Sequence, residues 1–256
     1  MSTTAPDAGH VSLDVADSIG TITFGHPRGN SLPGQLLRKL AATIEEAGHR
    51  HDVQVVRLQS SGTGPFCAGA SFDELQAIAT PDQGQVFFSG FASVILAMRA
   101  CPRFVVTRVH GKAAGGAVGL IAASDYCIAH ESASVRLSEL AIGIGPFVVG
   151  PPIAHRIGLA HYTALTVDHD WRDAAWAHRV GLYARTCDTI PALDDAVTSL
   201  VRRLARCHPA AMARLKQVFW EGTDHWPELL EERAAMSGAL VLSEFTRDAI
   251  AAFGTR

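Results

Sequence analysis

Short apolar runs alternate with helical patterns along the first two thirds of the chain, and helical patterns alone fill the last quarter. The runs rich in β-branched residues predict strands at 11–15, 20–24, 53–58, 104–109, 126–129, 134–137 and 182–187. Apolar residues at helical spacing predict helices at 36–44, 72–78, 86–99, 153–167, 171–181, 193–206, 210–220, 227–243 and 244–253. This order predicts an α/β sheet core followed by a C-terminal helical part.

The same pattern divides the chain. We expect a flexible tail over residues 1–10, a core over 11–192 and a C-terminal helical region over 193–256. The first two strands are predicted to form a hairpin across Ala16–Ile19, and Asn30 or Ser31 is expected to cap the first helix.

A glycine-rich turn follows an apolar, β-branched strand. Residues 104–109 lead into His110-Gly111-Lys112-Ala113-Ala114-Gly115-Gly116-Ala117 and then into a small-residue run of helical character. Free backbone N–H groups and the helix dipole at such a turn attract an anion, whether a phosphate, a carboxylate or a reaction oxyanion. The alternative is a turn without function. The sequence is not a P-loop, and its spacing does not match a dinucleotide-binding fingerprint.

A second loop has the same design. Ala68-Gly69-Ala70-Ser71 also follows a strand and precedes a helical pattern, and its small residues let a ligand approach the backbone. Amides from both loops could converge on one oxygen as an oxyanion hole, in which each donor is worth roughly 3–4 kcal/mol. Two unrelated tight turns are the alternative.

Glu139 is a single carboxylate in an apolar run, Leu137-Ser138-Glu139-Leu140-Ala141-Ile142. Burial would raise its pKa and suit it to acid/base work near neutral pH. The alternative is a glutamate that caps a helix or a turn.

Composition restricts the function classes. The formal net charge is −3 and the basic residues are dispersed, so we expect no nucleic-acid partner. Five widely spaced cysteines without a C-x-x-C pair indicate free thiols, and the twelve histidines lack ligand spacing, so we expect no metal. No apolar run reaches about 18 residues and the N-terminus lacks a signal-peptide pattern, so we expect a cytoplasmic protein without a membrane span.

Several motifs occur jointly in an order and spacing that match a known family. They are Pro27…Asn30-Ser31-Leu32, Phe66-Cys67-Ala68-Gly69-Ala70, His110-Gly111-Lys112-Ala113-Ala114-Gly115-Gly116-Ala117, Asp125 and Ser138-Glu139…Gly143…Pro146. On these residues the chain resembles the enoyl-CoA hydratase/isomerase (crotonase) superfamily over about residues 11–256, with some features of methylglutaconyl-CoA-hydratase-like members.

The resemblance implies a spiral of ββα units of the ClpP/crotonase type, with C-terminal helices that build homotrimers or homohexamers. It implies an acyl-CoA thioester substrate and no cofactor beyond the coenzyme A that the substrate carries. By position, the amides of Ala70 and Gly116 would form the oxyanion hole and Glu139 would be the catalytic acid/base. Contacts to CoA and substrate would come from Arg28, Ala68, Gly69, Gly115, Phe147 and Phe253, the last in the same or a neighbouring subunit.

One position departs from the family pattern. The best-known hydratases carry a second glutamate where this chain has Gly119. Three readings follow: hydration of a 2-enoyl-CoA with Glu139 as the one acid/base, isomerisation of an enoyl-CoA by one base, or acyl-CoA binding without turnover. Phe147 and its two neighbours stand where glycines are common, which predicts a narrowed pocket and short or branched acyl groups.

Overall fold

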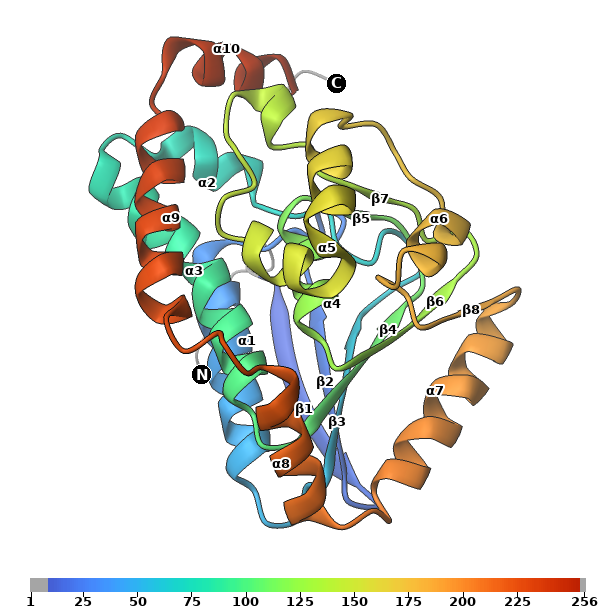
Figure 1. Cartoon of the computed structure of the whole chain (residues 1–256). Coiled ribbons are helices and arrows are strands. Elements are labelled where there is room, and N and C mark those ends of the chain that lie inside the picture. Colours follow the sequence, from blue (N-terminus) through green and yellow to red (C-terminus); the bar gives the residue numbers. More distant parts are fainter. Residues whose placement is uncertain (1–8, 254–256) are drawn as a thin grey trace, which may run out of the picture.

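The computed structural model describes residues 9–253 and centres on a mainly parallel sheet of six strands (Figure 1). Its order is β1 (His10–Ala16), β2 (Ile19–Gly25), β3 (Val55–Ser60), β4 (Phe104–Val109), β6 (Tyr126–His130) and β8 (Arg185–Cys187). Only the β1–β2 pair is antiparallel in this sheet. β5 (Ala113–Ala114) and β7 (Val135–Arg136) form a separate small parallel sheet.

The predicted hairpin is confirmed. Ala16 pairs with Ile19, and the two residues between them, Asp17 and Ser18, have φ values of 53° and 61°. Two successive left-handed residues give the tight turn whose twist matches that of the flanking strands.

Helices cover both faces of the sheet because its strands alternate apolar side chains between the two faces. Val56 and Leu58 of β3 belong to the larger core with α1 (Gly34–His49) and α3 (Pro81–Ala100), while Val55 packs with α7 (Ile190–Leu204). In Figure 1, α1 and α3 lie on one side of the sheet and α7 on the other. The first residues of the predicted C-terminal region, from 193, therefore lie in a helix that covers the sheet.

The remaining C-terminal helices fold back on the core. α9 (Trp226–Leu240) crosses α3 so closely that a Cβ at Gly84 would lie 2.6 Å from the Cα of Gly238. α8 (Pro209–Phe219) is tied to the sheet by the buried Lys216, whose Nζ donates to Asp125 Oδ2 at 2.7 Å and to the Arg103 carbonyl at 3.0 Å. The Asp125 carboxylate also accepts the Val105 N–H at 2.7 Å.

The predicted cap of the first helix is wrong. α1 begins at Gly34, whose N–H donates to the Glu74 carboxylate at 2.6 Å. Asn30 lies before the helix with φ +57°, and its amide donates to the carbonyls of Ser61 and Pro65. Asn30 therefore joins two loops, because the left-handed conformation that asparagine tolerates turns its side chain away from the helix start.

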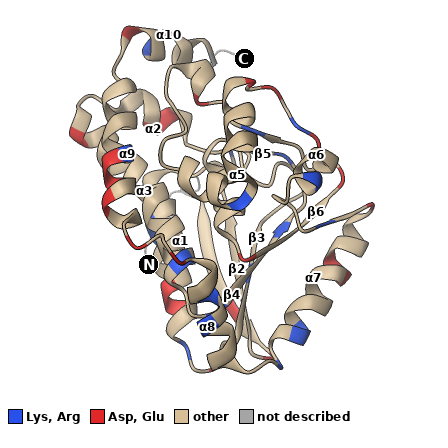
Figure 2. Ribbon diagram, in the orientation of Figure 1, with Lys and Arg blue, Asp and Glu red and all other residues tan. Residues whose placement is uncertain are grey.

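Residues 1–8 of the predicted tail lie outside the described part of the chain, and β1 already begins at His10. Basic side chains are spread over several helices, including α5 (Gly150–Val167), α6 (Ala174–Arg179), α7 and α8 (Figure 2). All five cysteines are free, and Cys207 alone among them is exposed. Within residues 9–253, no helix is long and apolar enough to cross a membrane.

Candidate functional site

The two glycine-containing loops lie side by side. A parallel bridge joins Cys67 to Ala113, and the Ala114 N–H donates to the Cys67 carbonyl at 3.0 Å. Gly69 has φ +89°, and a Cβ there would lie 2.6 Å from the Ala114 carbonyl oxygen and 3.6 Å from the Gly116 nitrogen. Glycine is therefore required at Gly69 both for its backbone conformation and for the close approach of the second loop.

The structure brings the two residues with the predicted donor amides to one pocket. Ala70 and Gly116 both line one pocket, and Gly116 is the first residue of α4 (Gly116–Ala123). Neither N–H donates a hydrogen bond to another group within residues 9–253. Two free amides at one pocket, one of them at a helix start, can stabilise an oxygen that gains negative charge.

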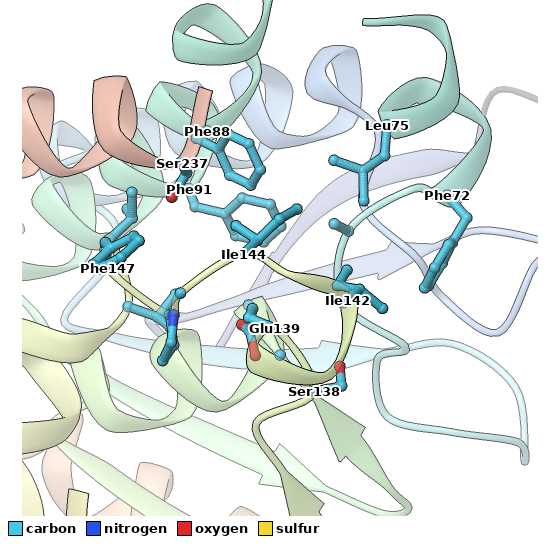
Figure 3. A pocket seen from close by; sticks show the side chains of 18 of the residues that line it. Phe72, Leu75, Phe88, Phe91, Ser138, Glu139, Ile142, Ile144, Phe147 and Ser237 are labelled. Atoms are coloured by element: carbon cyan, nitrogen blue, oxygen red, sulfur yellow. The ribbon is translucent and has the colours of Figure 1, made fainter. Parts of the chain in front are cut away.

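The pocket around these amides is mainly apolar (Figure 3). Its space is about 50 Å³, enough for a few water molecules. The apolar lining side chains that Figure 3 labels are Phe72, Leu75, Phe88, Phe91, Ile142, Ile144 and Phe147. Phe72 and Leu75 come from α2 (Phe72–Ala77), and Phe88 and Phe91 come from α3. An enclosure of this kind strengthens every electrostatic interaction inside it.

Glu139 supplies the one carboxylate that lines this pocket. It stands directly before a short 3₁₀ turn, η1 (Leu140–Ile142), and its side chain makes no capping hydrogen bond there. Its Oε2 is buried and has no hydrogen-bond partner among the described residues. The structure therefore does not support the alternative in which the Glu139 side chain caps a helix or a turn.

Burial raises the pKa of Glu139 to about 7, and the backbone N–H groups of Glu139 and Ser138 only partly offset this effect. Gly115 makes room for the carboxylate, since a Cβ at that position would lie 3.1 Å from Glu139 Oε1. A carboxyl group with a pKa near neutral can both take and return a proton under physiological conditions.

Gly119 stands where the best-known hydratases carry a second glutamate, and a neighbouring side chain fills the space beside it. A Cβ at Gly119 would lie 2.5 Å from Val149 Cγ1 and 2.6 Å from Val149 Cβ. Both residues are buried, and Val149 also lines the pocket. Val149 therefore fills the space into which any side chain at Gly119 would project.

The structure separates the other candidate residues. Ala68, Gly69, Gly115 and Phe147 line the same pocket as Glu139. Arg28 does not: it is exposed and forms an ion pair with Asp73 beside a separate surface hollow. α10 (Glu244–Phe253) ends at Phe253, whose side chain lies outside the described residues.

Apart from Phe147 and its two neighbours, the apolar lining was not foreseen, and neither was one hydroxyl. Phe72, Leu75, Phe88 and Phe91 fit ordinary helical periodicity, so the sequence does not distinguish pocket walls from core. Ser237 of α9 is only 1% exposed and lines the pocket. The signal available in the sequence was that Ser237 is a single polar residue on the buried face of its helix.

Comparison with known proteins places this chain in a family. The model of the enoyl-CoA hydratase/isomerase family matches residues 14–253. A (7aS)-7a-methyl-1,5-dioxo-2,3,5,6,7,7a-hexahydro-1H-indene-carboxyl-CoA hydrolase of Rhodococcus jostii is 28% identical over 204 residues, covering 77% of this chain and 75% of the relative. A probable enoyl-CoA hydratase of Rhodobacter capsulatus is 26% identical over 248 residues, covering 95% of this chain and 94% of the relative.

A solved structure has the same fold. The crystal structure of an enoyl-CoA hydratase from Bacillus halodurans superposes with a TM-score of 0.87 at 20% identity, covering 94% of this chain and 99% of that one. The expected mixed α/β crotonase fold is thereby confirmed. With a family model that matches nearly the whole chain, this protein belongs to the enoyl-CoA hydratase/isomerase family.

Proposed function

We propose that the protein hydrates a 2-enoyl-CoA thioester and uses Glu139 as its one acid/base. The observation that carries the proposal is the buried Glu139 carboxylate, whose Oε2 has no hydrogen-bond partner among the described residues, in the pocket that the Ala70 and Gly116 amides line. Two free amides and one carboxyl group with a pKa near 7 are the groups that enolate chemistry needs.

In the proposed reaction the thioester oxygen accepts hydrogen bonds from the amides of Ala70 and Gly116. The Glu139 carboxylate removes a proton from a water molecule as the water oxygen bonds to C3. The C2–C3 π electrons move to C2 and onto the thioester oxygen, which forms an enolate. The Glu139 carboxylic acid then returns its proton to C2, so the net change is the addition of one water. The amides act mainly on the enolate because its oxygen carries more negative charge than the thioester carbonyl does.

Isomerisation of an enoyl-CoA is the second candidate, and the packing of Val149 against Gly119 favours it. Moving a double bond requires one base to remove a proton from C2 and return it to C4, with no water to hold. The same two amides would stabilise the dienolate. The site needs no second carboxylate for this reaction.

The remaining proposals concern binding and assembly. The wall of Ala68, Gly69 and Gly115 supports a thioester in contact with the backbone, while Arg28 would reach CoA phosphates only in exchange for Asp73. We propose a homotrimer or homohexamer, which would cover exposed apolar side chains on α8 such as Leu215 and Val218. Free buried thiols support a cytoplasmic location.

The test follows the conjugated-enoyl absorbance of crotonyl-CoA, 3-methylcrotonyl-CoA and 3-methylglutaconyl-CoA. Loss of absorbance with the wild type, abolished by Glu139→Gln and retained by Glu45→Gln, would support hydration. Glu45 is the matched control because it is exposed on α1 and outside the pocket. Appearance of conjugation from a 3-enoyl-CoA, without loss of absorbance from the panel, would replace hydration by isomerisation. Tight binding without either change would refute catalysis.

A further inference from the structure

Helix α9 places one hydroxyl group in the wall of the pocket. Ser237 lines the pocket at 1% exposure, and the other polar side chains in the described lining are Ser138 and Glu139. In Figure 3, Ser237 lies where Phe88, Phe91 and Phe147 gather, and Glu139 and Ser138 lie together on another side. The hydroxyl is therefore set apart from the acid/base, at the aromatic part of the pocket.

The Ser237 hydroxyl makes no hydrogen bond with another described residue, although its backbone carbonyl accepts the Val241 N–H at 3.0 Å. A serine within a helix commonly donates to the carbonyl four residues earlier. Ser93 on α3 does so, with its Oγ 2.9 Å from the Ser89 carbonyl oxygen. Ser237 lines the pocket, so a ligand that fills the pocket can supply a hydrogen-bond partner for its hydroxyl.

The backbone around Ser237 is held in place. The next residue, Gly238, contacts α3, and a Cβ there would lie 2.5 Å from the Gln85 nitrogen. Any larger residue at Gly238 would push α9 away from α3. The close crossing of the two helices thus fixes the position of Ser237 in the pocket wall, as a recognition group requires.

The charges of the side chains that line the pocket restrict the chemical group that Ser237 can bind. No Lys, Arg or His side chain belongs to the pocket wall in the described part of the chain. Arg233, one turn before Ser237 on α9, is also not among the lining residues. A carboxylate on the acyl chain would lose its hydration here without gaining a cation, so a neutral oxygen is favoured.

We propose that Ser237 determines acyl specificity by a hydrogen bond to a neutral oxygen, a ketone or a hydroxyl, on the part of the acyl group remote from the thioester. The substrate class is then a short enoyl-CoA with an oxygenated end. This inference rests on the proposed enoyl-CoA chemistry and adds the identity of the acyl group to it. A site built to bond an oxygen discriminates strongly against the analogue that lacks it.

The test compares hex-2-enoyl-CoA with 5-oxohex-2-enoyl-CoA and 6-hydroxyhex-2-enoyl-CoA. We expect wild-type kcat/KM to be at least about tenfold higher for one oxygenated thioester than for the plain one. Ser237→Ala should bring this ratio close to one, while Ser93→Ala, the same change on the exposed face of α3, should preserve it. A wild-type ratio near one would overturn the proposal. An equal loss on all substrates in Ser237→Ala would also overturn it, because that result indicates a role in packing or in holding water.

A binding measurement separates this inference from the proposed reaction. Calorimetric titration with hexanoyl-CoA and 5-oxohexanoyl-CoA needs no turnover. Tighter binding of the oxo thioester by the wild type, lost in Ser237→Ala, supports recognition by Ser237 even if no enoyl-CoA is converted. Equal affinities for both thioesters, together with turnover of hex-2-enoyl-CoA, would refute the role of Ser237 and leave the proposed reaction intact. Thermal melting of Ser237→Ala checks that the fold is retained.

Discussion

Replacing Glu139 by glutamine removes the buried ionisable group of the pocket and should change how stability depends on pH. Burial raises the pKa of this carboxyl group from the ordinary value of 4.5 to about 7 in the folded protein. Between these values the folded chain keeps a proton that the unfolded chain releases. Stability therefore falls as pH rises through this window and levels off above pH 7.

The size of the effect follows from about 1.4 kcal/mol for each pH unit between the two pKa values. The wild type should lose about 3 kcal/mol of unfolding free energy to this group across the window, and about 2.5 kcal/mol of that between pH 5 and pH 8. Glu139→Gln keeps the shape of the side chain without the ionisation. Its stability relative to the wild type should therefore increase by that amount over the same interval.

Urea unfolding of both proteins at pH 5, 6.5 and 8 measures this difference directly. The other titrating groups are common to the two chains, so they cancel when the two curves are subtracted. Parallel pH profiles would show that Glu139 ionises in the folded state as it does in water, and would refute the argument that burial tunes it. Glu45→Gln supplies the control for removal of an exposed carboxylate.

Three further predictions test packing at the pocket and between α8 and the core. Gly119→Glu should cost about 1–3 kcal/mol because its Cβ would lie 2.5 Å from Val149 Cγ1, and adding Val149→Gly should recover part of the loss in urea unfolding. Lys216→Met should cost about 3–5 kcal/mol because it leaves the buried Asp125 carboxylate without its cation, and adding Asp125→Asn should restore part of that in the same assay. Phe147→Ala should raise kcat/KM for long relative to short acyl-CoA substrates by about tenfold by opening the pocket wall, and an unchanged chain-length profile would contradict this.

The sequence predicted the fold where local pattern and tertiary packing agree. The apolar, β-branched run at 104–109 is typical of a buried strand, and β4 has the predicted bounds. The prediction failed at Asn30, where a good capping residue is used to join two loops while Glu74, forty residues further on, takes the helix N–H. Local propensity cannot anticipate a cap that comes from another part of the chain.

The candidate site shows the same difference between what local pattern predicts and what depends on tertiary packing. Gly69, Gly116 and Glu139 could be selected from the sequence because glycine turns and an isolated carboxylate are unusual in apolar surroundings. Val149 was expected only to narrow the pocket, since nothing in its type shows that it packs on Gly119. Ser237 was also missed, because its role depends on the crossing of α9 over α3 and not on the residues next to it.

The turn that follows Glu139 packs against a helix about a hundred residues further along the chain. Gly143 ends the η1 turn with φ +80°, and a Cβ there would lie 2.5 Å from Thr246 Oγ1 of α10. The Ile144 N–H also donates to the Glu139 carbonyl at 2.9 Å. This bond closes the turn from Glu139 to Ile144, which packs against α10 as one unit. Because burial is the main cause of the raised pKa, we expect the packing of α10 on this turn to contribute to the proton affinity of the proposed catalyst. The C-terminal region also contributes Ser237 to the pocket wall.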